Sequence, residues 1–516
     1  MVESTFILYL LAVLALGYVA YRKTRDLADY ILGGRRLGPW VTALSAQASD
    51  MSGWLLLGLP GLAYRVGLAA SWMPLGLLVG TYLNWRFVAP RLREATQRLG
   101  NALTIPDYFE ARFDDSTRLL RFLAALGILI FFTLYTGAML VAGGLLFEAV
   151  FGIDYLWAVT AGTVTILLYT AFGGFLAVSW TDTLQAALMF LALVGAGLVG
   201  LWALGGFAGA GEAVRSHDPD LLRAFVGEGG VSLGVVGILS SLAWGLGYFG
   251  QPHILVRFMA IGDPQRMPAA RRIAMGWVTV CLFFAVAVGI IGAGYFGPEL
   301  MADGDESERV FIYLVNDLFH PLLAGVALAA ILAAVMSTAD SQLLVASSAV
   351  TEDLYRGLIR EKAGPRELVW IGRGAVVAVA LTAFALASDP DSRVLELVAY
   401  AWAGFGATFG PVILVSLLWR RMSGAAAAAG MIVGAVTIFT WRWLRSLAVD
   451  AADRLAELEQ PYVSMADRIL NAPAPLLELY ELLPGFVFSL LAIVVVTWLW
   501  PGRAAGAGGG ATSASS

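Results

Sequence analysis

Residues 46–54 read Ala-Gln-Ala-Ser-Asp-Met-Ser-Gly-Trp and stand in the middle of an otherwise apolar stretch, 40–62. An aspartate at the centre of a bilayer costs roughly 2.5–3.5 kcal/mol on insertion scales, so Asp50 needs a compensating role in a membrane helix. Small and hydroxylated neighbours can satisfy backbone groups that a break in a helix sets free. The stretch therefore predicts a membrane helix interrupted near Asp50. The simpler alternative is a polar contact between helices, in which Asp50 caps a half-helix.

A second apolar stretch, 232–259, contains Trp-Gly-Leu-Gly-Tyr-Phe-Gly-Gln-Pro-His at residues 244–253. Three glycines and a proline within a few residues disfavour a continuous helix, because proline donates no amide hydrogen bond and its ring disrupts the preceding turn. We expect an unwound stretch flanked by aromatic side chains. A kinked packing helix is the alternative.

The third unusual stretch is Ala-Ala-Val-Met-Ser-Thr-Ala-Asp-Ser at residues 333–341. Ser337 and Thr338 present adjacent hydroxyls, and Ala334 lies one turn earlier on the same side. Hydroxyls in membrane helices often bond to carbonyls of their own helix, which is the alternative interpretation. Asp340 lies within the same apolar run and is expected to face protein or water instead of lipid.

Composition identifies the class of protein. The chain has 516 residues, of which 59% are hydrophobic and 14% charged, whereas soluble domains carry about 25% charged residues. This excludes a soluble enzyme and a disordered protein. A net charge of −5 offers no basic surface for nucleic acid. The single cysteine, Cys281, excludes an intrachain disulfide, and the three histidines have no metal-ligand spacing. An integral membrane protein remains.

Windows of about 20 apolar residues, the length that spans a bilayer as a helix, predict about 13 transmembrane helices in an all-α protein. The predicted segments are 5–21, 40–62, 67–87, 122–149, 155–172, 183–205, 232–259, 273–296, 318–347, 371–387, 393–418, 424–444 and 482–500. Most of the 33 Lys and Arg residues fall in alternate loops and in the C-terminal tail. The positive-inside rule then places the N-terminus outside and the C-terminus in the cytoplasm.

The positions of the two breaks suggest an internal repeat. If segments two to six and seven to eleven form two five-helix units, each unit begins with a broken helix, and the odd number of helices gives the units opposite topology. Paired interruptions of this kind indicate the central site of a transporter. The expected organisation is a peripheral first helix and cytoplasmic loop (1–36), a first repeat (37–206), an extracellular loop (207–231), a second repeat (232–419), two peripheral C-terminal helices (420–502) and a flexible cytoplasmic tail (503–516).

Broken helices offer oxygen ligands to a hard cation such as sodium without a full counter-charge, so the ion can also leave. Backbone carbonyls near Ala48 and Met51, the Ala334 carbonyl and the hydroxyls of Ser337 and Thr338 fit this description. Asp50 could attract the ion without ligating it.

Half-helix N-termini attract a carboxylate, and freed carbonyls accept from an ammonium group, so two broken helices also suit an amino acid. Tyr135, Trp244 and Tyr248 could enclose a small apolar ring, with ordinary packing as the alternative. Asp182 precedes the segment predicted at 183–205. It is interpreted either as a helix N-cap or as a residue on the cytoplasmic ion path.

The stretches ASDMSGWLLLGLPG (48–61), SLAWGLGYFGQPHILVRFMAI (241–261) and MSTADSQLLVASSAVTEDLY (336–355) closely resemble the solute:sodium symporter family, and the resemblance covers nearly the whole chain. It implies a leucine-transporter-type 5+5 inverted-repeat core, no enzymatic activity and no cofactor, with sodium as coupling ion and L-proline as substrate. The implied sodium site consists of Ala48, Met51, Ala334, Ser337 and Thr338. The implied substrate region comprises Ser52, Gly53, Trp54, Tyr135, Trp244, Tyr248 and Pro252. Asp50, Asp182 and Asp340 are the carboxylates expected on the ion path or near it.

The expected activity is sodium-coupled import of L-proline across the cell membrane by alternating access, without nucleic acid or an obligatory protein partner. Three alternatives remain at this point. The same fold could carry another amino acid or small organic solute. Protons could replace sodium through Asp50 or Asp340. A channel or membrane sensor is the third.

Overall fold

The computed structural model describes residues 2–21, 31–170, 174–301, 306–389, 392–457 and 477–502, and their regular structure is helical apart from two isolated β-bridges. The flexible tail predicted at 503–516 lies outside these residues, as do the basic loop residues Arg22, Lys23 and Arg25. The prediction of an all-helical membrane protein is confirmed.

Every predicted apolar segment corresponds to helical structure. The chain begins with α1 (Val2–Tyr21). The first predicted repeat contains α3 (Pro39–Asp50), α4 (Gly53–Leu56), α5 (Gly58–Val66), α6 (Trp72–Leu83), the π-helix η3 (Asn84–Val88), α7 (Ala89–Arg98), α8 (Ile105–Phe113), α9 (Leu119–Phe151), α10 (Tyr155–Thr170) and α11 (Phe175–Ala203). Next comes α12 (Gly206–His217). The second predicted repeat contains α13 (Gly234–Ala243), the 3-10 helix η6 (Trp244–Gly250), α14 (Pro252–Ala260), α15 (Met267–Phe296), α16 (Val310–Leu318), α17 (Pro321–Ser348), the π-helix η10 (Ala349–Ile359), α18 (Pro365–Ala387) and α19 (Val394–Leu418). Two further long helices follow, α20 (Gly424–Glu457) and α22 (Leu482–Leu499).

Nine helical stretches of the described chain are long and apolar enough to cross a membrane, judged by length and composition. The predicted segment 232–259 is not among them, because it is broken into the shorter pieces α13, η6 and α14. Segment 40–62 is likewise divided, and its second half belongs to one helical stretch, Gly53–Arg98, that also contains segment 67–87. Interruption of the helices thus accounts for part of the difference from thirteen.

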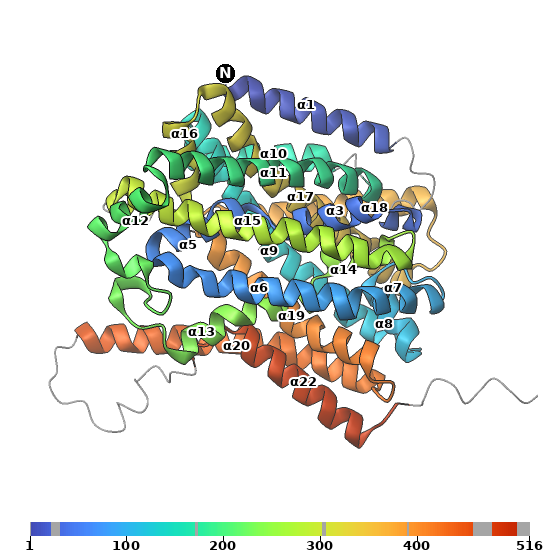
Figure 1. Cartoon of the computed structure of the whole chain (residues 1–516). Coiled ribbons are helices and arrows are strands. Elements are labelled where there is room, and N and C mark those ends of the chain that lie inside the picture. The colour runs from blue at the N-terminus through green and yellow to red at the C-terminus, as the bar shows by residue number, and fades with distance from the viewer. Residues whose placement is uncertain are drawn as a thin grey trace, which may run out of the picture.

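The helices lie side by side, so the bundle has two ends (Figure 1). α7 and α8 lie at one end, whereas α12 and α16 lie at the other. α17 forms the centre: it packs against α3, α9, α11 and α18, and most of its side chains are buried. Small residues make this close packing possible, because they let neighbouring helix backbones approach one another.

Candidate functional site

The first helix break lies at Met51 and Ser52, where the backbone leaves the helical conformation between α3 and α4. The Ser52 amide donates to the Asp50 carbonyl at 3.0 Å instead of to the Ala48 carbonyl, which a continuous helix would require. The Ala48 carbonyl is therefore released from the hydrogen-bond ladder of its own helix. This confirms the interruption predicted for segment 40–62.

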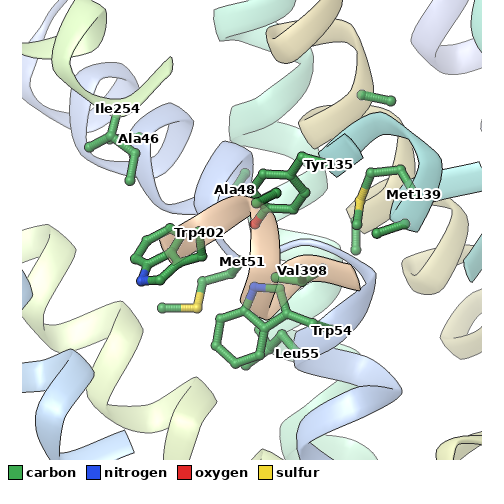
Figure 2. Packing of buried hydrophobic residues seen from close by; sticks show 14 of the residues in the cluster. Ala46, Ala48, Met51, Trp54, Leu55, Tyr135, Met139, Ile254, Val398 and Trp402 are labelled. Carbon is green, nitrogen blue, oxygen red and sulfur yellow. The ribbon is translucent and has the colours of Figure 1, made fainter. Parts of the chain in front are cut away.

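The released Ala48 carbonyl meets the two hydroxyls of α17. Ser337 Oγ donates to it at 2.8 Å and Thr338 Oγ1 at 3.4 Å, although these residues are almost 290 positions away in the sequence. Ser337 Oγ also lies 3.0 Å from the Ala334 carbonyl. Four of the five oxygen sources predicted for a sodium site thus converge. The fifth residue, Met51, lies at the break itself and is fully buried (Figure 2).

The second break lies at Gln251, whose extended backbone separates η6 from α14. Pro252 has no amide hydrogen for the carbonyl four residues earlier, that of Tyr248. The side-chain amide of Asn84 supplies the missing donor at 3.0 Å. An interruption within 244–253 is confirmed, but it is shorter than predicted: residues 244–250 form a 3-10 helix, and only Gln251 has an extended backbone. An asparagine from another segment satisfies the freed carbonyl.

A buried carboxylate connects the two breaks. Tyr248 donates its hydroxyl proton to Asp50 Oδ2 at 2.7 Å, and Trp54 Nε1 donates to the Asp50 carbonyl at 3.2 Å. Three other polar atoms in this neighbourhood, Asp50 Oδ1, Ser52 Oγ and the Tyr135 hydroxyl oxygen, are buried and have no hydrogen-bond partner within the part of the chain that the structure describes. A buried polar atom without a partner needs an explanation, and a polar ligand, an ion or a water molecule bound at this place would supply one.

Aromatic side chains surround these atoms. The Trp244 ring lies 6.3 Å from Trp54 and 6.5 Å from Trp402, and the Tyr248 ring meets Trp402 edge-on at 5.1 Å. Trp402 Nε1 donates to the Trp244 carbonyl at 2.8 Å. Trp402, Trp54, Met51 and Tyr135 gather around one place in the interior, as Figure 2 shows. Trp402 belongs to α19, so this helix contributes to the site.

Two glycines allow the backbones to approach at the breaks. A β-carbon on Gly53 would lie 2.7 Å from the β-carbon of Ala142, which would separate α4 from α9. A β-carbon on Gly247 would lie 1.9 Å from Trp402 Nε1. The sequence therefore needs glycine at both positions for close contact.

Tyr135 lies beside the first break, whereas Pro252 faces a separate space. Tyr135 on α9 lies close to Ser52 and Trp54, and its ring meets His253 edge-on at 6.1 Å. Neither nitrogen of the His253 ring has a hydrogen-bond partner among the described residues. Pro252 begins α14 and lines a small cavity together with Phe175 and Leu344.

Asp182 lies well inside α11, because this helix begins at Phe175 and not at 183 as predicted. The interpretation of Asp182 as a helix N-cap is therefore wrong. Asp182 Oδ2 accepts from Arg257 Nη2 at 3.1 Å and from Ser45 Oγ at 2.6 Å, and both members of the ion pair are fully buried. Ser341 Oγ lies 3.3 Å from Asp340 Oδ1 and accepts a hydrogen bond from Arg257 Nη2 at 2.5 Å. The two aspartates thus share one buried polar cluster.

Two residues of this region were missed by sequence reasoning. Arg257 and Asn84 are polar residues inside predicted spans, so the rule that an intramembrane polar residue is functional could have singled them out. Trp402 lies in the stretch AYAWAGFGATFGP (399–411), which also resembles the solute:sodium symporter family and is expected to close the site, but no local signal separates Trp402 itself from packing residues. In the observed conformation the residues at the breaks are closed off from solvent, so a ligand enters only when helices move.

Comparison with known proteins was made against families, individual sequences and solved structures. Residues 30–434 match the model of the Sodium:solute symporter family. A "Sodium/proline symporter" of Salmonella typhimurium is 49% identical over 96% of this chain and 92% of its own length. The "High-affinity proline transporter PutP" of Bacillus subtilis is 47% identical over 94% of this chain and 95% of its own length.

Solved structures show the same fold at low sequence identity. A Na+-coupled sialic acid symporter in a substrate-bound outward-open state superposes with a TM-score of 0.76 at 19% identity, over 98% of this chain and 99% of that one. MhsT in complex with L-phenylalanine has a TM-score of 0.52 at 15% identity, over 90% of this chain and 98% of that one. The family match covers most of the sequence and the fold match nearly all of it, and by this evidence the chain belongs to the sodium:solute symporter family.

Proposed function

We propose that this protein is a multi-pass transporter of the cell membrane that couples the inward flow of sodium to the uptake of L-proline. Relatives that share nearly half of its residues over almost the whole length carry sodium/proline symporter or proline transporter as their names. The observation that carries the proposal is the meeting of the released Ala48 carbonyl with two hydroxyls of α17, beside unsatisfied polar atoms at the same break.

Sodium is proposed to bind between α3 and α17. The ligands would be the carbonyls of Ala48, Met51 and Ala334 with the hydroxyls of Ser337 and Thr338. The hydroxyls now donate protons toward these carbonyls; a cation at this place would face the oxygen lone pairs from both helices. All five ligands are neutral, which suits an ion that must be released again.

Proline is proposed to bind at the two breaks, among Ser52, Gly53, Trp54, Tyr135, Trp244, Tyr248 and Pro252. The pyrrolidine ring is apolar and suits the faces of Trp54 and Trp244. The carboxylate suits the N-terminal end of a half-helix, and the secondary ammonium suits an acceptor such as Asp50 Oδ1, which lacks a donor within the described chain.

The other carboxylates are proposed to act on the ion rather than on proline. Asp182 and Asp340 lie in one cluster around Arg257, and Ser341 of this cluster donates to the carbonyl of Ser337 at 2.7 Å. This hydrogen bond connects the cluster to the proposed sodium ligands. A cation that passes toward the cytoplasm would therefore meet negative charge directly beyond its binding site.

The order of elements supports two inverted repeats, 37–206 and 232–419. Each begins with a broken helix (α3 to α5, and α13 to α14), continues with a long stretch (α6 and α7, and α15) and then a nine-residue helix (α8, and α16). Three long helices follow in both, α9 to α11 and α17 to α19. α8 and α16 lie at opposite ends of the bundle in Figure 1, as opposite topology requires.

We propose the remaining organisation from the sequence: thirteen spans, an outside N-terminus, a cytoplasmic C-terminus, an extracellular loop at 207–231 and peripheral helices at 1–36 and 420–502. One sodium ion that moves inward across 100 mV releases about 2.3 kcal/mol. This would support roughly fifty-fold accumulation of proline before any sodium concentration gradient is added.

The decisive experiment uses purified protein in liposomes loaded with potassium buffer. We expect labelled proline to accumulate only when an inward sodium gradient is imposed, with further stimulation by a negative interior. Uptake driven by a pH gradient in sodium-free buffer would contradict sodium coupling. If unlabelled proline fails to exchange with labelled proline while another amino acid does, the assigned substrate is wrong. Non-saturating current without exchange would indicate a channel.

A further inference from the structure

Tyr480 lies in the short described stretch that leads into α22, far from both breaks in the sequence. Its ring nevertheless stacks on Trp244, with ring centroids 5.3 Å apart and an angle of 22° between the planes. Trp244 in turn faces Trp54 across 6.3 Å. The peripheral C-terminal region therefore reaches an aromatic side chain of the proposed substrate region.

Two hydrogen bonds hold Tyr480 itself, and a third holds the residue before it. Its amide donates to Ser240 Oγ of α13 at 3.0 Å, and its hydroxyl donates to the Ala399 carbonyl of α19 at 2.6 Å. The preceding carbonyl, that of Leu479, accepts from Trp441 Nε1 of α20 at 3.1 Å. The tyrosine thus connects the first half of the broken second helix with α19, which supplies Trp402.

Leu482, two residues after Tyr480, adds a second contact between the start of α22 and the region of the second break. The side chain of Leu482 fills the space beside Gly406. A β-carbon added to Gly406 would lie 2.5 Å from Leu482 Cδ1 and 2.9 Å from the Gly247 α-carbon. α22 therefore packs directly on the η6 turn that carries Trp244 and Tyr248. Tyr480 is 8% exposed, so its ring is part of the interior.

We propose that Tyr480 is a substrate-positioning residue that acts through Trp244. Its stacked ring and its hydroxyl bond to α19 fix the indole in the orientation that faces Trp54, so the space for the substrate ring has a defined width. The inference rests on the proposed function, because it concerns the affinity and selectivity of the same proline site. No contact of Tyr480 with sodium ligands is involved, so its effect falls on proline.

Three variants test the two contacts separately. Tyr480→Ala removes the stacked ring and the hydroxyl, Tyr480→Phe removes the hydroxyl alone, and Tyr480→Trp keeps a stacked ring. We expect Tyr480→Ala to raise the Kd and the KM for proline about tenfold, the size that a lost aromatic stack and a lost hydrogen bond allow. Tyr480→Phe should raise the Kd and the KM for proline about threefold. Tyr480→Trp, which also keeps a stacked ring, should have values close to those of Tyr480→Phe.

A matched control is Tyr155, which is equally buried and donates its hydroxyl proton to the Ala387 carbonyl at 3.0 Å. Tyr155→Ala and Tyr155→Phe remove the same chemistry away from the aromatic group at the breaks. They should change expression or melting temperature but leave the proline Kd within about twofold of wild type.

The readouts are equilibrium binding of labelled proline to purified protein, uptake at saturating sodium, and competition by pipecolate, the six-membered homologue of proline. In Tyr480→Ala the inhibition constant of pipecolate divided by that of proline should fall, because a less restrained indole widens the site. The sodium concentration for half-maximal uptake at saturating proline should stay unchanged. A folded Tyr480→Ala protein with wild-type Kd and selectivity would overturn the inference. An increase in the sodium concentration for half-maximal uptake by the same factor as the increase in the proline Kd would also overturn it. If wild-type protein itself binds no proline, the proposed function fails instead.

Discussion

At the scale of single residues, the proposed ion site depends on one released carbonyl. The Ser52 amide bonds to Asp50, so the Ala48 carbonyl is left for the hydroxyls of Ser337 and Thr338. Neither hydroxyl is needed to hold α17 together, since the backbone of this helix is continuous from Pro321 to Ser348. Their value must therefore lie in what they offer to the facing helix.

The residue-scale prediction follows from this. Ser337→Ala combined with Thr338→Ala should raise the sodium concentration for half-maximal proline uptake by roughly tenfold to a hundredfold, since hydrogen bonds to charged groups contribute about 1.5–3 kcal/mol. The control is Ser348→Ala with Thr351→Ala, because within the described chain these hydroxyls bond only to carbonyls of α17, from which η10 continues, with shortest distances of 2.9 and 2.8 Å. A double variant with wild-type sodium dependence would remove Ser337 and Thr338 from the ion site.

At the scale of elements, the breaks were predictable and their partners were not. Polar residues around Asp50, and the glycines with Pro252, conflict locally with a continuous apolar helix, so the sequence itself signals an interruption. The groups that satisfy each break come from elsewhere: Asn84 is 164 residues from Tyr248, and Tyr480 is more than 200 residues from Trp244. Such pairings depend on tertiary packing, which no local pattern encodes. The early start of α11, which placed Asp182 inside a helix, was missed because polar residues around the predicted boundary, such as Thr181 and Thr183, interrupt the apolar run that the helix nevertheless continues.

The element-scale prediction concerns close approach at the breaks. Gly247→Ala should abolish proline uptake, because its β-carbon would overlap the Trp402 indole, and Gly53→Ala should reduce it strongly by pushing α4 from α9. Gly276→Ala is the control, since its β-carbon would meet no atom within 4 Å and helix propensity favours alanine by about 1 kcal/mol. Uptake is compared at equal amounts of protein in the membrane. Unimpaired transport by Gly247→Ala would show that the two helices do not meet as described.

At the scale of the whole molecule, the buried ion pair joins four helices. Arg257 on α14 reaches Asp182 on α11, Ser45 on α3 and Ser341 on α17, so one guanidinium connects both broken helices with the helices behind them.

Arg257→Gln or Asp182→Asn alone leaves a buried charge without its partner and should destabilise the protein by about 3–5 kcal/mol. The combined variant should recover part of this loss, seen as a higher melting temperature than either single variant. The exposed pair Arg98–Glu94 is the control, and its removal should change stability by less than about 1 kcal/mol. Additive losses in the double variant would show that the two charges do not depend on each other.

Coupling itself is a property of the whole molecule, because the proposed sodium ligands and the proposed proline residues share one structural element. Ala48 precedes the break that Ser52 and Asp50 form, so an ion that fixes the Ala48 carbonyl also fixes the backbone that faces proline. Thermodynamic linkage then requires that sodium raise the affinity for proline by the same factor by which proline raises the affinity for sodium. We expect a factor of roughly 5 to 150 in each direction, as is usual for coupled sites. Calorimetric titration of purified protein with proline at several sodium concentrations, and with sodium at several proline concentrations, measures both factors.

Replacement of sodium by potassium should lower the melting temperature and abolish the stabilisation by proline, since only a ligand that binds the folded state stabilises it. Proline binding that is equally tight in potassium would mean that the first break does not connect the two sites.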